Sequence, residues 1–580
     1  SKLPPGTRFV RCRSQTLPRG AGLNRMRAGG ALTDAGTATR EKSLAALIVA
    51  HARSQPDEVA FRFLGRRSGQ ARDLTWGRLA DDAIRIAGHL AAFHLAGKPV
   101  AILCPDAHEF LPALAACFLV GAVAVPTPPV SSRRSSGRIA SIVKSAHAHA
   151  LVAGRGVMAL PWVAGLIEGR GMKILRLEDL GDEPSGVSLG NRHDPSAPAL
   201  LQFTSGSTGD PVGVLLTNAN IAANCDAIAE AYGLDRTTVG LSWLPLHHDM
   251  GLIGHVLTPI RLGCRSCIMD PLVFLQRPLS WLQRIGEEKA TITSAPNFAY
   301  ELCNKAAEAS EAPPMDLSSL STAVCGGEPV QWWTLERFAA RFQPFGFKWP
   351  AFAPSYGLAE ATLLVASGKT PSGPKPQGKW TSLGSPVRGV KVRVVEPETG
   401  LEVPHGGLGE IEIYGASVGR LIGGTQGEPI AGRVRTGDLG FLAEGSLVVT
   451  GRRKELIILK GQNVFPADVE AAAIGASALV VPGGTAAIGC EEEGSEALVV
   501  VAEIRRPAAS EDTIVRVRRL ISEKVALATG HAAREVVTVE FGSLPRTSSG
   551  KVQRGIVREL YLAGGLRRLA EARQETAGLP

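Results

Sequence analysis

A short run rich in glycine and hydroxyl side chains is the part of this sequence best suited to phosphate chemistry. The run consists of Thr204, Ser205, Gly206, Ser207, Thr208 and Gly209. Glycine lets the backbone approach an anion closely and adopt positive φ. Successive backbone N–H groups can then form a concave anion site, to which the hydroxyls add donors. No GK[ST] follows, so the run is not a Walker A loop. Taken alone, it is either a phosphate cradle or a plain surface turn.

The residues around this loop indicate how it would be held. The apolar run at 199–203 predicts a buried strand, and a helix is expected from near Asn218. Helical patterns at 43–52 and 77–93 alternate with strand-like runs at 100–104 and 123–125. The alternation resumes after the loop, with helices at 221–232 and 278–289 and strands at 240–244, 292–294 and 323–325. This pattern is typical of an α/β fold with parallel sheets.

The pattern of predicted elements changes near residue 390, where alternation of helices and strands gives way to successive strands. Runs at 390–395, 409–414 and 446–450 alternate like antiparallel strands and predict a small β subdomain. Strands at 478–481, 497–504 and 535–539, with helices at 468–473 and 511–527, predict a small α+β domain. Residues 367–380, rich in Gly, Pro and Lys, are expected to form a loop. We therefore predict a large domain of two α/β layered sheets plus the β subdomain at 41–450, followed by a small domain at 457–580.

Composition bounds the class of protein. A chain of 580 residues exceeds what one core usually supports. The hydrophobic fraction of 44% and the charged fraction of 20% are ordinary for globular proteins. The net charge of +9 owes much to a basic segment at residues 1–40, which we expect to be disordered. Scattered Lys and Arg elsewhere do not indicate a nucleic-acid partner.

Cysteine spacing and hydropathy argue against a disulfide framework, a zinc site and a membrane span. Nine cysteines show no disulfide-like pattern, and the single CxxC of Cys264 and Cys267 has no second pair to complete a zinc site. The apolar run at 110–125 contains Pro112 and Gly121. It predicts a buried helix followed by a buried strand, not a membrane span. No secretory-signal pattern is visible, so we expect a cytoplasmic protein without stable membrane insertion.

Several further motifs follow the loop in a fixed order. They are LPLHHDMGLIG at 244–254, GGEP at 326–329, PSYGLAEAT at 354–362, RTGDLG at 435–440, GRRKELIILKGQNVFPADVE at 451–470 and LPRTSSGKVQR at 544–554. The series resembles the adenylate-forming superfamily of acyl-CoA synthetases, luciferases and peptide-synthetase adenylation domains. The resemblance covers residues 41–560. The HHDMGL run, with AVPTPP at 124–129, is most similar to the fatty-acyl-AMP ligases.

The resemblance implies a role for each nucleotide-site residue. The 204–209 loop would cradle the β- and γ-phosphates of ATP, and Glu360 with Thr204 would hold Mg²⁺, which prefers oxygen ligands. Tyr356, between Ser355 and Gly357, would stack on adenine. Asp438 would accept hydrogen bonds from the ribose hydroxyls. The remaining residues implied along the nucleotide are Gly326, Gly327, Glu328 and Arg452. A helix-terminal carboxylate is the alternative for Glu360.

The resemblance also implies two catalytic residues and a hinge. Lys551 would bridge the substrate carboxylate and the α-phosphate as negative charge develops; outside its motif it would be a solvated surface lysine. His248 would border the acyl pocket and the adenylate, with a core histidine as the alternative. Lys454, within a hinge at 451–456, would let the small domain rotate after adenylation and admit the thiol acceptor.

Three departures from the family pattern concern the acceptor and the nucleotide. Val212 stands where the phosphate loop usually carries lysine. The stretch at 364–382 is short for a fatty-acyl-AMP ligase, which carries an insertion associated with the block on coenzyme A chemistry. The segment at 421–433 is abbreviated and lacks the usual aromatic motif.

The sequence thus predicts an ATP- and Mg²⁺-dependent ligase that adenylates a medium- or long-chain fatty acid. The expected acceptor is the phosphopantetheine thiol of an acyl carrier protein, in a lipid, polyketide or lipopeptide pathway. An acyl-CoA synthetase is one alternative. A non-catalytic module that binds acyl-adenylates or lipids is the other, and the presence of Lys551, Glu360 and Asp438 together argues against it.

Overall fold

The computed structural model describes most of the chain between residues 43 and 569. The described ranges are 43–67, 69–129, 133–160, 163, 171–181, 194–204, 212–309, 313–422, 432–459, 462–492, 495–505, 510–547 and 550–569. The segment at 1–40, expected to be disordered, lies outside them. So do residues 205–211 of the glycine and hydroxyl loop and most of the abbreviated segment at 421–433.

A seven-stranded sheet forms the first half of the large domain. Its order is β20 (Arg420–Ile422), β8 (Val212–Thr217), β7 (Pro198–Thr204), β4 (Val123–Pro126), β3 (Pro99–Leu103), β5 (Ala150–Ala153) and β6 (Lys173–Arg176). Strands β7, β4, β3, β5 and β6 run parallel. Strands β7 and β8 are antiparallel, with Thr204 opposite Val212. The loop at 205–211 therefore connects the carboxyl end of β7 to β8.

A nine-stranded sheet forms the second half. Its order is β17 (Ser385–Pro386), β14 (Leu364–Ser367), β13 (Phe352–Gly357), β12 (Thr322–Gly326), β11 (Ile292–Ala295), β9 (Val239–Ser242), β10 (Arg265–Met269), β1 (Val59–Leu64) and β2 (Ala71–Thr75). The strands from β13 to β1 pair in parallel, and antiparallel strands close both edges. Loops that follow β9, β12 and β13 therefore meet at one edge of the sheet.

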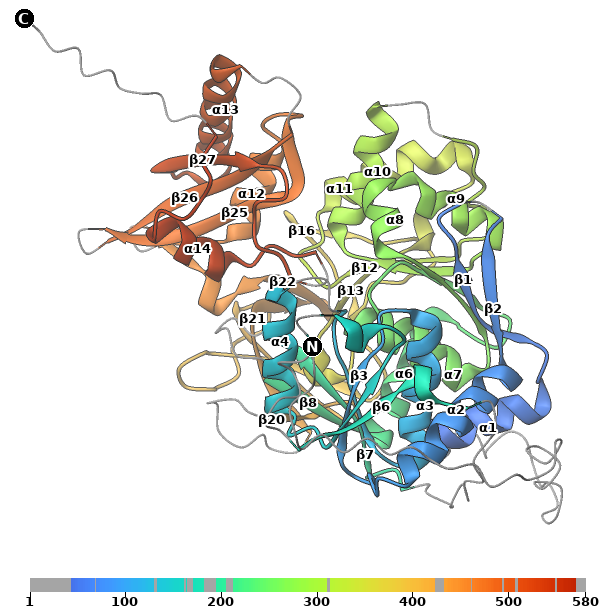
Figure 1. Ribbon diagram of the computed structural model, residues 1–580. Helices are drawn as coiled ribbons and strands as arrows, with labels where there is room; N and C mark the ends of the chain where they lie inside the picture. The colour runs from blue at the N-terminus through green and yellow to red at the C-terminus, as the bar shows by residue number, and fades with distance from the viewer. Residues whose placement is uncertain are drawn as a thin grey trace, which may run out of the picture.

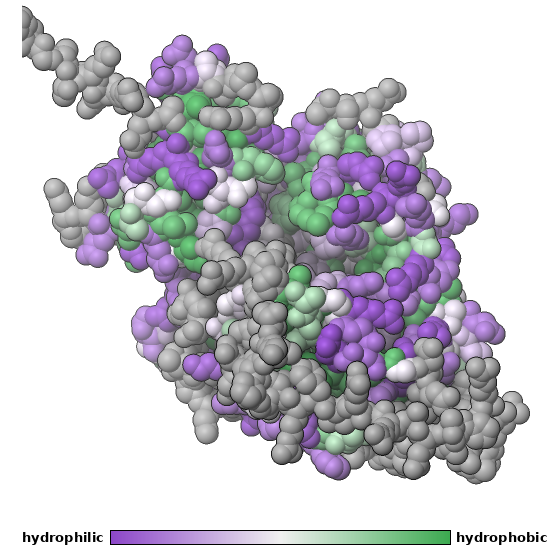
Figure 2. Space-filling model, in the orientation of Figure 1, coloured by the Kyte–Doolittle hydropathy of each residue, from purple (hydrophilic) through white to green (hydrophobic). Residues whose placement is uncertain are grey.

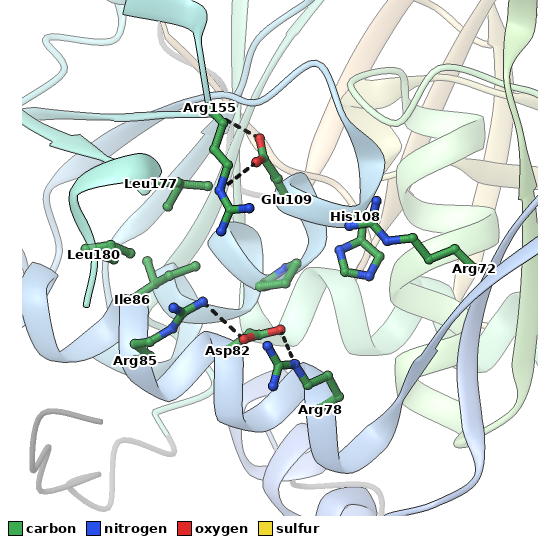
Figure 3. Close-up of a pocket in the computed structure, with 11 residues that line it drawn as sticks. Arg72, Arg78, Asp82, Arg85, Ile86, His108, Glu109, Arg155, Leu177 and Leu180 are labelled. Carbon is green, nitrogen blue, oxygen red and sulfur yellow. Dashed lines mark hydrogen bonds and ion pairs between the residues drawn. The ribbon is translucent and has the colours of Figure 1, made fainter. Parts of the chain in front are cut away.

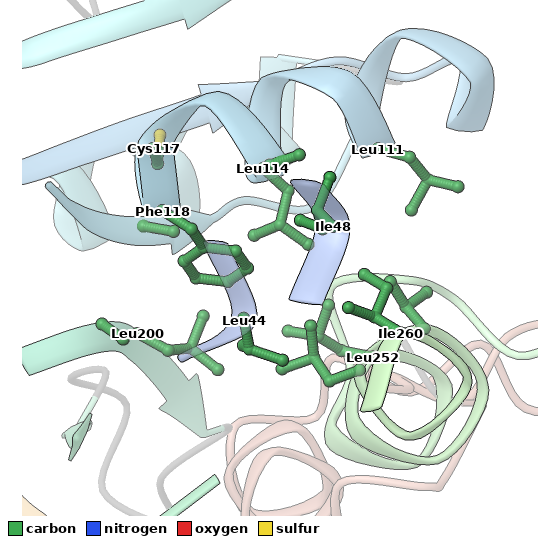
Figure 4. Packing of buried hydrophobic residues seen from close by; sticks show 14 of the residues in the cluster. Leu44, Ile48, Leu111, Leu114, Cys117, Phe118, Leu200, Leu252 and Ile260 are labelled. Atoms are coloured by element: carbon green, nitrogen blue, oxygen red, sulfur yellow. The ribbon is translucent and has the colours of Figure 1, made fainter. Parts of the chain in front are cut away.

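Helices between the two sheets bury the main core (Figure 1). They are α1 (Leu44–Ser54), α2 (Trp76–Ala91), α3 (Ala107–Val120), α6 (Asn218–Tyr232), the π-helix η4 (Met250–Leu257) and α7 (Thr258–Leu262). Figure 4 shows α3 side chains such as Phe118 packing with Leu44 of α1, Leu200 of β7 and Leu252 of η4.

Two outer helical layers complete the large domain. Helices α8 (Pro271–Gln276), α9 (Leu279–Glu288), α10 (Asn297–Ala309) and α11 (Trp332–Phe342) cover the nine-stranded sheet, and α4 (Arg133–Ser145) covers the seven-stranded one. The predicted pair of α/β layered sheets is confirmed.

The predicted β subdomain is also confirmed. It is an antiparallel sheet of β18 (Val390–Val395), β19 (Gly409–Gly415), β21 (Arg433–Ala443) and β22 (Ser446–Arg452). The small α+β domain follows and lies above this sheet in Figure 1, drawn orange to red. It contains the ribbon β23 (Ile457–Leu459) and β24 (Gln462–Val464), the sheet β25 (Val480–Glu492), β26 (Ser495–Ile504) and β27 (Glu535–Glu540), and helices α12 (Pro466–Ile474), α13 (Glu511–Thr529) and α14 (Arg554–Leu562).

Two secondary-structure predictions were wrong. Residues 367–380 are not all loop, because β15 (Pro376–Gln377) pairs with β16 (Trp380–Thr381) across a tight turn at Gly378. Strand β25 extends to Glu492 instead of ending at 481. The Pro-Gly-Gly after Val481 predicts the end of a strand. In the structure the strand continues, with a register shift between Val480 and Thr485.

The apolar run at 110–125 forms a buried helix followed by a buried strand, as predicted. Helix α3 ends at Val120, and Gly121 adopts the left-handed conformation (φ 69°) that a non-glycine residue disfavours. Strand β4 follows at once and is fully buried. Among the described residues, no helix combines the length and the apolarity that a bilayer crossing needs.

Candidate functional site

Glycines at the ends of β12 and β13 bring two backbones into close contact. Gly326 pairs with Ser355 in the parallel sheet, and a Cβ on Gly326 would lie 2.5 Å from the Ser355 carbonyl oxygen. Gly327 has φ of 78°, which favours glycine. Gly357 ends β13, where a Cβ would overlap the Leu363 carbonyl. The sequence-predicted GGE and SYG residues thus form one tightly packed wall at the carboxyl edge of the sheet.

Asp438 joins this wall to the four-stranded sheet. It pairs across β21 and β22 with Arg452, whose Nε lies 2.9 Å from the Asp438 Oδ1. The Tyr356 hydroxyl donates to Asp438 Oδ2 at 2.6 Å. Burial and the Asp438 carboxylate raise the pKa of Tyr356 well above its usual value, so the phenol keeps its proton. Three residues predicted for the nucleotide therefore form one hydrogen-bonded unit.

Lys551 of the small domain extends to the same wall. Its Nζ lies 3.7 Å from the position that a Cβ on Gly327 would occupy. Burial lowers the pKa of Lys551, while the Asp249 and Glu328 carboxylates act in the opposite direction. Glu328 in turn accepts the Phe298 backbone N–H at 2.6 Å. The structure thus brings residues of the HHDM and GGEP motifs close to the Lys551 amine of the last motif.

The HHDM motif occupies the turn between β9 and the π-helix η4. Asp249 Oδ1 lies 2.6 Å from His248 Nδ1 and accepts the Met250 N–H at 2.7 Å, so it caps η4. Burial alone would raise the pKa of Asp249, but His248 and Lys551 hold it below its usual value. Burial also lowers the pKa of neighbouring His247 to about 3, which keeps that imidazole neutral. His248 is therefore oriented by a carboxylate that also faces Lys551.

Glu360 lies on the short 3₁₀ turn η7 (Ala359–Ala361), directly after β13 and Tyr356. Burial raises the pKa of Glu360, and the Asp438 and Asp249 carboxylates add to the rise while Arg452 opposes it. A carboxylate crowded by two others gains from a nearby cation, so the donor chemistry fits Mg²⁺. The other sequence-predicted ligand, Thr204, ends β7, and its loop companions Ser205, Gly206, Ser207, Thr208 and Gly209 lie outside the described residues.

Lys454 lies where the two domains join. It is the middle residue of the 3₁₀ turn η8 (Arg453–Glu455). On one side, Arg453 pairs with Glu398 of the large domain at 2.6 Å. On the other, Glu455 pairs with Arg554 of the small domain at 2.6 Å. Residue 454 therefore lies between an ion pair to the large domain and an ion pair to the small domain.

Among the described residues, side-chain contacts hold the small domain against the large one. The Lys305 amine donates to the Val480 carbonyl at 3.1 Å, and Lys379 pairs with Asp468 at 2.8 Å. The rings of Trp380 and Phe465 meet edge to face, with centroids 5.7 Å apart. Trp380 belongs to the β15–β16 hairpin. Figure 2 shows the surface hollowed between the small domain and the α8–α11 layer.

Sequence reasoning missed two contributors to this site. Asp249 was part of the quoted motif, yet its carboxylate, and not only His248, faces Lys551. Thr362 is fully buried with φ of 69°, rare for a β-branched residue. It turns the chain after Glu360, with Leu363 N–H bonded to the Ala361 carbonyl at 2.9 Å and the Thr362 hydroxyl donating to Ser417 O at 2.6 Å. No sequence pattern signals such strain.

We call the meeting of Lys551 with Gly327, Asp438 and Tyr356 the domain junction. The fold and this junction are those of an adenylate-forming enzyme, and comparison with known proteins supports this class. The family model described as AMP-binding enzyme matches residues 48–421. The chain therefore belongs to the AMP-binding enzyme family.

Named relatives share nearly the whole length of the chain. A 4-hydroxyphenylalkanoate adenylyltransferase of Mycobacterium bovis is 33% identical over 90% of this chain and 92% of its own length. The medium-chain-fatty-acid–[acyl-carrier-protein] ligase JamA of Moorena producens is 32% identical over 87% of this chain and 93% of its own. A solved structure from work on fatty acyl-adenylate ligases of E. coli and L. pneumophila superposes with a TM-score of 0.81 at 29% identity, covering 90% of this chain and 98% of that one.

Proposed function

We propose that this chain activates a medium- or long-chain fatty acid with ATP and passes the acyl group to the phosphopantetheine thiol of an acyl carrier protein. The observation that carries the proposal is the position of Lys551 beside Gly327, in the same junction as Asp438, Tyr356 and Glu328. The relatives named as fatty-acid ligases support the substrate class.

In the first half-reaction, a carboxylate oxygen of the fatty acid attacks the α-phosphorus of ATP. The bond from that phosphorus to the bridging oxygen breaks, pyrophosphate leaves and acyl-AMP forms. Little covalent work falls to the protein, so its contribution is positioning and charge neutralisation. The Lys551 ammonium supplies positive charge where two anionic groups meet.

The nucleotide is held by residues of both sheets and of the β subdomain. The Gly326–Gly327 backbone and the Tyr356 ring border the adenine, and the Asp438 carboxylate accepts from the ribose with Arg452 beside it. Bound Mg²⁺ would neutralise phosphate charge, with Glu360 and Thr204 as its protein ligands and residues 204–209 around the β- and γ-phosphates. Val212 leaves the start of β8 without the lysine that the family usually has there.

In the second half-reaction, the acceptor thiol loses its proton to water and its sulfur attacks the acyl carbonyl carbon. The bond from that carbon to the phosphate oxygen then breaks, and AMP leaves. The Lys551 amine occupies the junction through which a thiol would approach. We therefore assign Lys454 as a hinge, about which residues 457–580 turn away from residues 41–450 between the two steps. The ion pairs on either side of Lys454 support this position.

The test is ATP–pyrophosphate exchange with a panel of fatty acids from C6 to C18, followed by product analysis with coenzyme A or a phosphopantetheinylated carrier protein. We expect acid-dependent exchange, and thioester only on the carrier. Thioester on coenzyme A instead would assign an acyl-CoA synthetase. No exchange with any acid would leave the alternative of a non-catalytic binding module. A cytoplasmic location and a role in polyketide or lipopeptide synthesis are part of the same proposal.

A further inference from the structure

A second cluster of charged side chains lies beside the seven-stranded sheet. None of its residues belongs to the nucleotide site. Figure 3 shows Arg78 and Arg85 of α2 reaching Asp82 from two sides, and Arg155 reaching Glu109. The Asp82 distances are 2.9 and 3.2 Å, and the Arg155–Glu109 distance is 3.6 Å. The groups surround an open cavity of about 170 Å³. At roughly 30 Å³ per water, that is room for more than a single ion.

The cavity lies where the strand order of the sheet reverses. From β3 the chain passes through α3 to β4 on one side, whereas from β5 it passes to β6 on the other. The segments after β3 and β5 therefore diverge and open a crevice at the carboxyl ends of two adjacent parallel strands. Ligands of open α/β sheets bind in such crevices. His108 and Glu109 come from the β3 side of the crevice, and Arg155 from the β5 side.

Charge in the cavity favours an anion. Four arginines and two carboxylates line it, and Asp106 pairs with Arg72 at 3.7 Å, so the cluster holds one positive charge in excess. Asp82 accepts from both Arg78 and Arg85, and Arg85 also donates to the Gly181 carbonyl at 3.4 Å. The cavity also lies at the amino-terminal turn of the 14-residue helix α3, where Asp106 is the N-cap and Glu109 lies in the first turn. Burial and Arg72 lower the pKa of His108, so that ring is neutral and adds no charge.

The backbone between β5 and β6 is already organised around carboxylates. The Arg155 N–H donates to Glu109 Oε2 at 3.0 Å, and the Gly156 N–H donates to Glu178 Oε2 at 3.3 Å. These bonds fix the base from which the Arg155 side chain extends. That side chain is 68% exposed and Arg78 is 65% exposed, so both can move onto a ligand.

One wall of the cavity is apolar. Ile86, Pro112, Leu177 and Leu180 contribute it. A charged rim over an apolar wall suits a molecule with an anionic head and a small hydrocarbon body, rather than a bare ion. A phosphate monoester presents three terminal oxygens, enough to accept from guanidinium groups on two walls, whereas a carboxylate presents only two.

We propose that this crevice, the switch-point pocket, binds a small organic phosphate monoester. Arg85 and Arg155 hold the phosphate from opposite walls, and Ile86 and Leu177 contact the organic group. The site is separate from the nucleotide-site residues, with which it shares no lining residue.

Isothermal titration of the full chain with phenyl phosphate tests the proposal. We expect one saturable site, with inorganic phosphate and benzoate each at least tenfold weaker. The double variant Arg85→Gln/Arg155→Gln should weaken phenyl phosphate at least tenfold. Arg516→Gln/Arg519→Gln on the exposed face of α13 makes the same charge change elsewhere and should leave binding unaltered. Thermal unfolding of each variant checks that the chain is folded.

A parallel arm separates this pocket from the nucleotide site. Asp438→Ala should retain phenyl phosphate binding if the probe occupies the switch-point pocket. Loss of binding in Asp438→Ala, with retention in the arginine double variant, would place the probe in the nucleotide site and overturn the proposal. Equal affinity for phenyl phosphate and inorganic phosphate, or tighter binding of benzoate, would overturn the assigned class of ligand.

Discussion

The domain junction and the switch-point pocket both gather charged side chains at the carboxyl ends of parallel strands, but they do so differently. In the junction, the packing is tight: Asp438 is 6% exposed and Tyr356 is 8% exposed, and the backbone at Gly326 has no room for a Cβ. In the pocket, three of the four arginines are more than half exposed, and they pair with the exposed Asp106 and with the largely buried Asp82 and Glu109.

This difference indicates two kinds of site. Buried charges in fixed positions stabilise a developing charge without reorganising. Exposed, paired arginines contribute little to folding, and they can exchange one anion for another. The first arrangement suits catalysis and the second suits reversible binding. The comparison predicts large effects of substitutions in the junction and small effects on stability of substitutions in the pocket.

The largest effect is expected from Lys551→Ala. Removing the ammonium should lower kcat for ATP–pyrophosphate exchange by about 10²- to 10³-fold, the usual range for a lost electrostatic stabiliser. The KM for ATP should change little, because other residues hold the nucleotide. Lys524→Ala, on an exposed position of α13 in the same domain, is the matched control. A variant at 551 that retains the wild-type rate would contradict the assigned role.

Gly326→Ala should come next. The added Cβ would meet the Ser355 carbonyl at 2.5 Å, and overpacking of this kind costs about 1–3 kcal/mol of unfolding free energy. Separation of β12 from β13 should also displace Tyr356 and raise the KM for ATP. Denaturant unfolding and exchange kinetics provide the two measurements.

Gly137→Ala is the control for that glycine. It lies inside α4, where a Cβ meets nothing within 4 Å, so alanine should stabilise the helix by up to about 1 kcal/mol. If Gly326→Ala were as stable as wild type, the close contact between β12 and β13 would not limit the side chain at residue 326.

Most of the fold could be predicted from the sequence because its signals are local. Alternating helical and strand patterns gave both layered sheets, and the change of pattern near 390 gave the β subdomain. The β15–β16 hairpin at 376–381 was missed because its Pro, Gly and Lys content is typical of loops. Strand β25 was cut short because Pro482 and two glycines follow Val481, and only pairing with β26 carries the strand through them.

The site was predictable in its parts but not in its assembly. Ordered motifs named Lys551, Asp438 and Tyr356, yet no periodicity places Lys551 beside Gly327, since that contact depends on how two domains pack. The switch-point pocket had no sequence signal at all. Its arginines lie on α2 and after β5 at irregular spacing, and they become a cluster only through the strand order of the sheet.

Removal of a carboxylate near Lys551 should have a smaller, pH-dependent effect. The Asp249 carboxylate favours the charged form of Lys551, whose pKa burial lowers. In Asp249→Asn the pKa of Lys551 should fall further, so the alkaline limb of kcat/KM for exchange should move to lower pH. The Asp468→Asn variant, which removes a carboxylate on α12, should leave the limb in place. A shift toward higher pH, or none, would show that Asp249 does not act on the amine.

The smallest effect is expected from a pocket arginine. Arg72→Gln removes an ion pair with Asp106 at 3.7 Å, in which both side chains are more than half exposed, so unfolding free energy should change by less than about 0.5 kcal/mol. Arg284→Gln on α9 makes the same change at a side chain that is 7% exposed and donates to the Gly65 carbonyl at 2.9 Å. Losing that buried donor should cost about 1–3 kcal/mol. Urea unfolding of both variants measures the difference. Equal losses would mean that the pocket arginines support the fold, and the contrast between the two kinds of site would then fail.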